Sequence, residues 1–86
     1  MSYLTQMRVR NNHGALERIL GVVRVRGFGV RSMSALPDAA GSHFDLTLKV
    51  VCPRPPHRLS RQLAKLVDVE NVEIFGRLEQ AGTGLG

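Results

Sequence analysis

The stretch Asn11-Asn12-His13-Gly14-Ala15-Leu16-Glu17-Arg18-Ile19-Leu20 decides how the rest of this chain is interpreted. Its first four residues are types that form tight turns and helix caps, and they follow a segment in which side chains alternate in polarity. Apolar residues then recur at the i, i+3, i+4 and i+7 spacing of one helix face: Leu16, Ile19, Leu20 and Val23. The stretch therefore predicts a strand, a glycine-containing turn and an amphipathic helix in succession.

A turn of this kind has two interpretations. The first backbone N–H groups of a helix have no acceptor within the helix, and together with the helix dipole they can hold an anion such as a carboxylate. A capped strand-to-helix turn that binds no ligand is the alternative, and the turn residues alone are compatible with both.

Length and composition bound the class of protein. The 86 residues suffice for one small domain with one core, and a chain this short is expected to dimerise. A hydrophobic content of 43% and a charged content of 22% are typical of a soluble globular domain. The N-terminus lacks a secretory apolar segment and no stretch could span a bilayer, so we expect a cytoplasmic protein without membrane partners. The net charge of +5 fits either a nucleic acid or an acidic protein partner.

Hydrophobic periodicity along the chain predicts six elements. Turn-forming residues separate them, notably the loop that starts at Pro37 and ends at Gly41. The order βαββαβ is that of the ferredoxin-like α+β fold, a four-stranded antiparallel sheet with two helices on one face. The predicted elements are a strand over residues 3–10, a helix over 14–26, strands over 28–36 and 43–50, a helix from Pro55 or Pro56 to Asp68, and a strand over 69–75.

Three finer expectations concern burial. The mixed pattern of the second strand predicts partial cover on both of its faces, and Val67 is expected on the apolar stripe of the second helix with Leu59, Leu63 and Leu66. Because both helices share one sheet face, the other face is left open. We expect that open face to offer Arg8, Arg10 and Lys49 to an acidic partner. Its predicted occupants are Leu4, Arg8, Arg10, Met33, Thr47, Lys49 and Val51.

An RNA-binding module is one alternative function. Arg26-Gly27-Phe28-Gly29-Val30 matches the start of a motif that RNA-recognition modules carry on their third strand. Here the match falls between the first helix and the second strand, and aromatic residues make up only 5% of the chain, too few for a base-stacking platform. We therefore interpret Gly27 as a helix C-cap and Phe28 as a core residue, which argues against nucleic acid as a partner.

Catalytic and metal-binding constellations are missing from the sequence. The acidic residues are scattered, with no pair arranged for acid–base chemistry, and His13, His43 and His57 lie on different predicted elements. Cys52 is the single cysteine, so neither a disulfide framework nor a zinc site is expected. We predict no catalytic residue, metal or cofactor in this chain.

The turn and two further stretches resemble a known family. Residues 11–20, then Arg26-Gly27-Phe28-Gly29-Val30-Arg31-Ser32, look like the start of an ACT domain and, more narrowly, of the small regulatory subunits of acetolactate synthase. Gln62-Leu63-Ala64-Lys65-Leu66-Val67-Asp68-Val69 is similar to the second helix and last strand of that family. The likeness covers about residues 7–75, and the short chain looks most like the isozyme II type. It implies a single ACT domain over residues 1–79, followed by a flexible tail over 80–86.

The resemblance also implies an effector site. Valine-responsive members of the family bind a branched-chain amino acid at a dimer interface, where the strand-to-helix turn of one subunit faces the second strand of the other. Asn11 and Gly14 occupy the turn positions, and Asn12, His13 and Ala15 are expected to offer N–H groups to the carboxylate. Gly29 and Val30 lie on the facing element, where Gly29 replaces the asparagine of the family. That departure removes a side-chain amide, and the isozyme II type is described as insensitive to valine.

The implied partner is the large catalytic subunit of acetolactate synthase. In this family the catalytic subunit holds thiamine diphosphate, magnesium and FAD, and the small subunit acts by binding and activating it in branched-chain amino acid biosynthesis. A stand-alone ACT amino-acid sensor for another enzyme is a third interpretation, beside the RNA-binding module.

Overall fold

The computed structural model describes residues 2–52 and 55–76 and confirms the predicted order of elements. The predicted tail over residues 80–86, and the end of the expected domain at residues 77–79, lie outside the described residues. The elements are β1 (Ser2–Arg10), α1 (Ala15–Val25), β2 (Gly29–Pro37), β3 (His43–Val51), α2 (His57–Ala64) and β4 (Val69–Gly76).

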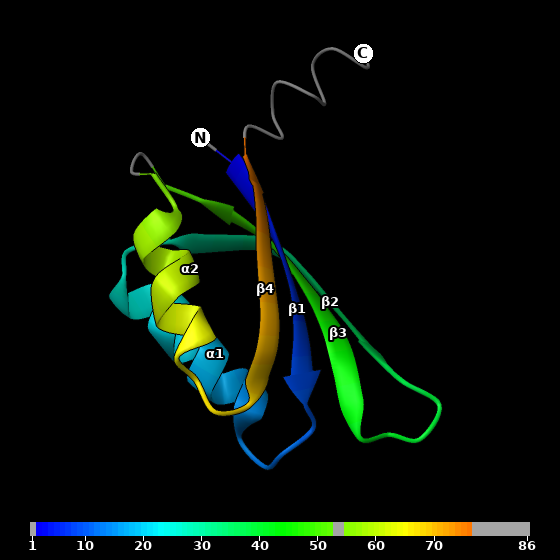
Figure 1. The fold of residues 1–86 in the computed structure, drawn as a ribbon. Coiled ribbons are helices and arrows are strands. Elements are labelled where there is room, and N and C mark those ends of the chain that lie inside the picture. Colours follow the sequence, from blue (N-terminus) through cyan, green and yellow to red (C-terminus); the bar gives the residue numbers. More distant parts are fainter. Residues whose placement is uncertain (1, 53–54, 77–86) are drawn as a thin grey trace, which may run out of the picture.

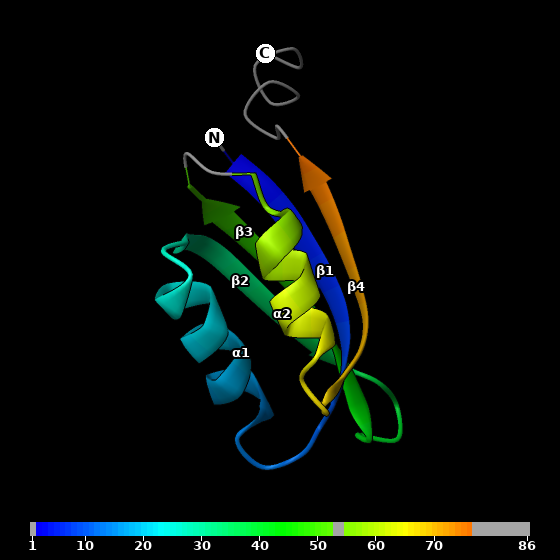
Figure 2. The same cartoon turned by 60° about the vertical axis from the view of Figure 1, so that its left-hand side comes forward.

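The four strands form one antiparallel sheet in the order β2-β3-β1-β4. Both helices lie against the same face of this sheet and leave the other face open (Figures 1 and 2). The architecture is the ferredoxin-like α+β fold that the periodicity predicts. It follows because each βαβ crossover returns a helix to the same side of the sheet.

The core lies between the helices and the two central strands. Along β1 and β3, alternate side chains point toward the helices and are buried, as the period-2 pattern requires. Thr5 in β1 is fully buried, and its Oγ1 donates a hydrogen bond of 3.2 Å to the carbonyl oxygen of Leu48. The fully buried apolar side chains are Val9, Ile19, Val23, Leu46, Leu48, Val50, Leu59 and Leu63.

The end of α1 confirms the structural interpretation of the RNA-like motif. Gly27 adopts a left-handed φ of 83°, which a glycine accepts without a Cβ clash. The N–H of Phe28 then donates 3.1 Å to the carbonyl oxygen of Val23, and the Phe28 side chain is only 6% exposed. A buried phenylalanine cannot stack on a base.

The expected partial cover of β2 is wrong, since every residue of this strand is exposed. β2 lies at the sheet edge with β3 as its one neighbour, and the helices leave it uncovered. Met33 is also wrongly placed on the open face. It pairs with the buried Leu48, and cross-strand partners point to the same side, so Met33 lies on the helix face although 49% of it is exposed.

The second helix is shorter than predicted, because it ends at Ala64 and not at Asp68. The N–H groups of Lys65 and Leu66 bond to carbonyls three residues back, which tightens the last turn and ends the α-helical period. Val67 therefore leaves the apolar stripe and is 76% exposed.

Candidate functional site

A cavity of about 410 Å³ lies at the turn between β1 and α1. The side opposite the turn is apolar and comes from the end of β2 and the start of β3. The structure thus brings together five of the seven predicted site residues. The lining consists of Asn11, Asn12, His13, Gly14, Ala15, Leu16 and Glu17, with Ala35, Pro37 and Phe44 opposite.

Gly29 and Val30 do not join this cavity within one chain. They lie at the first end of β2, whereas Pro37, which lines the cavity, lies at the other end. Eight residue steps at about 3.3 Å separate the two ends of the strand, roughly 26 Å. Any contribution of Gly29 and Val30 to the cavity must come from a second chain.

The donors in the turn differ from those predicted. The N–H of Asn12 donates 2.8 Å to the carbonyl oxygen of Arg10, and the N–H of Ala15 donates 3.1 Å to that of Asn12, so neither is available. Among the described residues, the N–H groups of His13, Gly14, Leu16 and Glu17 have no protein acceptor. Of the three predicted donors only His13 stays available, and the first turn of α1 adds Leu16 and Glu17.

Asp68 holds the turn in place, a role that the sequence interpretation missed. Its carboxylate accepts 2.7 Å from Asn12 Nδ2 and 2.8 and 2.7 Å from Arg18 Nε and Nη2, and only 1% of the residue is exposed. The carbonyl oxygen of Asp68 accepts from the N–H of Arg10 at 2.7 Å, and Arg18 Nη2 also donates 3.0 Å to that of His13. In the sequence, the only indication of this role is that an acidic residue, Asp68, stands between two apolar residues, Val67 and Val69.

Three described carboxyl groups, those of Asp38, Asp68 and Glu70, have lowered pKa values, and for Asp68 and Glu70 the largest cause is a side-chain hydrogen bond. Hydrogen bonds from Asn12 and then Arg18 lower the pKa of Asp68 and outweigh the opposite effect of burial. Near the last residue of β1, a hydrogen bond from Arg10 is the largest cause that lowers the pKa of Glu70, and a hydrogen bond from His43 is the next.

We expect acid to destabilise the fold through these groups. A carboxyl whose folded pKa is lowered stabilises the folded chain above its ordinary value, which is 3.8 for Asp68 and 4.5 for Glu70. That stabilisation is lost as the pH falls from 4.5 through the lower folded pKa values. The urea midpoint of unfolding should drop between pH 6 and pH 3, and it should depend less on pH in Asp68→Asn. If the midpoint of the variant depended on pH as strongly as that of the wild-type chain, the contribution assigned to Asp68 would be wrong.

The arginines predicted to dock a partner on the open sheet face are already paired. Arg8 contacts Asp38 and Asp45 at 3.2 Å each, and Arg10 contacts Glu70 at 2.8 Å. The charges of Arg8 and Arg10 are thus largely neutralised within the chain, whereas Lys49, the third cation predicted on this face, has no ion-pair partner among the described residues.

The described residues contain neither a metal-binding cluster nor a membrane-spanning helix. Residues 2–52 and 55–76 hold no group of three or more His, Cys, Asp or Glu side chains that could bind a metal ion. Neither described helix is long and apolar enough to cross a membrane.

Comparison with known proteins identifies relatives. The family model described as an ACT domain matches residues 11–72. The acetolactate synthase isozyme 2 small subunit of Escherichia coli K12 is 40% identical over 74 residues, which cover 86% of this chain and 85% of that protein. The isozyme 3 small subunit of the same strain is 28% identical, over 90% of this chain and 48% of its own length.

A solved structure agrees with this result at the level of the fold. The acetolactate synthase small subunit of Thermotoga maritima superposes with a TM-score of 0.76 at 22% identity, covering 93% of this chain and 50% of that one. The described sheet and helices therefore have the ACT topology. The chain belongs to the ACT domain family and, within it, to the small subunits of acetolactate synthase.

Proposed function

We propose that this chain is the regulatory subunit of an acetolactate synthase in branched-chain amino acid biosynthesis. The observation that carries the proposal is the 40% identity to a small subunit of that enzyme over 85% of the relative's length. The small subunit performs no chemistry of its own. It changes activity by binding the active form of the catalytic subunit more tightly than the inactive form.

The catalytic partner supplies the reactive groups in this proposal. Thiamine diphosphate, magnesium and FAD would be bound by the large subunit, which carries out the reaction. The complex assembles in the cytoplasm, where the pathway operates.

We also propose that the chain forms a homodimer through the free edge of β2. This strand exposes unpaired backbone groups and three large apolar side chains: Val30 is 40%, Met33 49% and Leu36 66% exposed. Such an edge pairs readily with a second copy. Antiparallel pairing of two β2 strands would carry Gly29 and Val30 of the partner subunit toward the cavity at the turn.

The cavity has the chemistry to bind an α-amino acid. The unpaired N–H groups of Leu16 and Glu17 suit a carboxylate, and the Glu17 side chain suits an ammonium group. The apolar wall formed by Pro37 and Phe44 suits a branched side chain. We propose valine as the first effector to test.

Reconstitution tests the regulatory role. Sedimentation first tests whether the purified chain has twice the 9.5 kDa mass of one copy. The chain is then titrated into the catalytic subunit of the same organism in the presence of thiamine diphosphate, Mg²⁺ and FAD. We expect acetolactate formation from pyruvate to rise several-fold and to saturate, and L-valine to change the plateau. The chain alone, as control, should form no acetolactate. An activity that is unchanged by the added chain would refute the regulatory role.

A further inference from the structure

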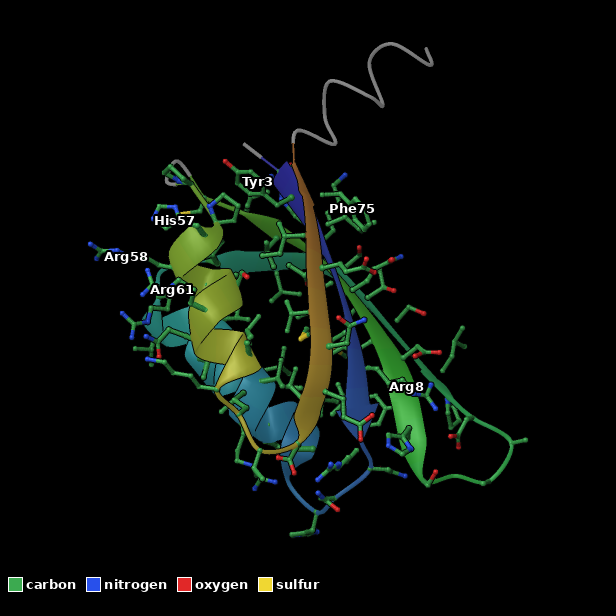
Figure 3. All side chains as sticks on the ribbon, viewed as in Figure 1. Tyr3, Arg8, His57, Arg58, Arg61 and Phe75 are labelled. Atoms are coloured by element: carbon green, nitrogen blue, oxygen red, sulfur yellow. The ribbon has the colours of Figure 1, made fainter. Side chains whose placement is uncertain are left out.

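Five cations on the helical layer have no ion-pair partner among the described residues. Together they form what we call the basic helical face. Each lies on α1, on α2 or in the residue that follows one of these helices, and four of the five are exposed. In Figure 3, Arg58 and Arg61 project from α2 away from the sheet. The face consists of Arg24, Arg26, Arg58, Arg61 and Lys65.

Unpaired positive charge is thus denser on the helical layer than on the sheet, where Arg31 and Lys49 are the unpaired cations among the described residues. On the sheet side, Asp38, Asp45 and Glu70 already neutralise Arg8 and Arg10. On the helix side, the carboxylate of Asp68 is occupied by Arg18 at 2.7 Å. No described carboxylate of this chain lies within ion-pair distance of the basic helical face, which leaves its charge available to a partner.

A groove between α1 and α2 adds apolar surface to this charge. Its volume is about 360 Å³. Gly21 leaves the floor open, since a Cβ built there would meet no atom within 4 Å. Val25, on the wall, is 83% exposed. The lining residues are Arg18, Gly21, Val22, Val25, Arg26, Gln62 and Leu66.

We propose that the basic helical face and this groove dock an acidic, amphipathic segment of the catalytic subunit. The proposal rests on the proposed regulatory function and names the surface through which it acts. Carboxylates of the segment would pair with Arg58, Arg61 and their neighbours, while an apolar side chain would enter the groove beside Val25. Charge at the rim steers and orients such a complex, and the apolar contact supplies affinity.

A protein segment suits this surface better than RNA does. Single-stranded RNA needs aromatic side chains on which bases stack, and neither α1 nor α2 carries an aromatic residue other than His57. The groove is lined mainly by aliphatic groups, which complement an apolar side chain. Homodimerisation through the edge of β2 would leave the outer side of the helices accessible.

Charge reversal on α2 tests the proposal. The helical variant Arg58→Glu is compared with the sheet variant Lys49→Glu, which makes the same charge change on β3 and leaves the edge of β2 intact. Glutamate at position 58 lies in the first helical turn, where the dipole favours it, so the fold should persist and circular dichroism will check it. We expect the helical variant to bind the catalytic subunit about tenfold or more weakly, and the sheet variant about twofold at most.

Each outcome of the binding experiment decides one question. Equal losses in the two variants, or no loss in either, would overturn the docking surface while the activation by wild-type chain keeps the regulatory role. Failure of the wild-type chain to bind the catalytic subunit would overturn both. The face would instead be assigned to RNA if the wild-type chain bound a single-stranded RNA in a salt-dependent way and only the helical variant lost that binding while still binding the catalytic subunit.

Discussion

Replacing Leu46 with alanine is expected to lower the free energy of unfolding by about 2–5 kcal/mol. Leu46 is fully buried on the helix face of β3, where it pairs with Met7 of β1 and Ala35 of β2. The loss combines the transfer free energy of the removed methyl groups with the cavity that close-packed neighbours cannot fill. Urea unfolding followed by circular dichroism measures it.

The control for this prediction is an exposed aliphatic residue. Val67→Ala removes methyl groups from a side chain that is 76% exposed, and it should change the free energy of unfolding by less than about 0.5 kcal/mol. If Leu46→Ala behaved like this control, Leu46 would not belong to the core.

Replacing Gly14 with valine is expected to disturb both the fold and the cavity at the turn. Gly14 has a φ of 78°, where a β-branched residue is strained by roughly 1–3 kcal/mol. In addition, a Cβ there would lie 3.0 Å from Arg18 Nη1, so the guanidinium that binds Asp68 must shift. We expect lower stability in urea unfolding and loss of L-valine binding in calorimetry.

Gly27→Val separates the two effects of the Gly14 substitution. Gly27 has a similar φ of 83°, but a Cβ there would meet no atom within 4 Å. Gly27→Val should therefore show the backbone strain alone and leave valine binding unchanged. Equal losses of stability and of binding in the two variants would mean that the contact with Arg18 has no influence on the turn.

The order of elements was predictable because each element carries its own local signal. The period of 2 in β1 and β3 and the period of 3.6 in α1 reflect burial on one face, which the sequence records directly. Whether a strand lies at the edge of a sheet has no such signal. The exposure of β2 and the placement of Met33 depend on strand order and register, which only the assembled sheet reveals.

The candidate site also has a part that local sequence signals predict and a part that depends on the assembled fold. The residues of the turn are consecutive, so their spacing identified them together. Pro37 and Phe44 join the cavity from other strands, and Asp68 reaches Arg18 across 50 positions of the chain. The donors changed because the N–H of Asn12 folds back onto Arg10, a choice that depends on backbone geometry.

Arg18 belongs to two places at once. Its guanidinium donates a hydrogen bond to the carbonyl oxygen of His13 at the turn between β1 and α1, and the same side chain lines the groove between the helices. An occupant of either place therefore acts on a side chain that the other also uses. Coupling between two binding sites is reciprocal. If an amino acid at the turn changes the affinity for the large subunit by some factor, the large subunit changes the affinity for the amino acid by the same factor. On these two proposals, sensitivity to the effector would be a property of the assembled enzyme, to be measured in the complex, and Arg18 is the side chain that both places share.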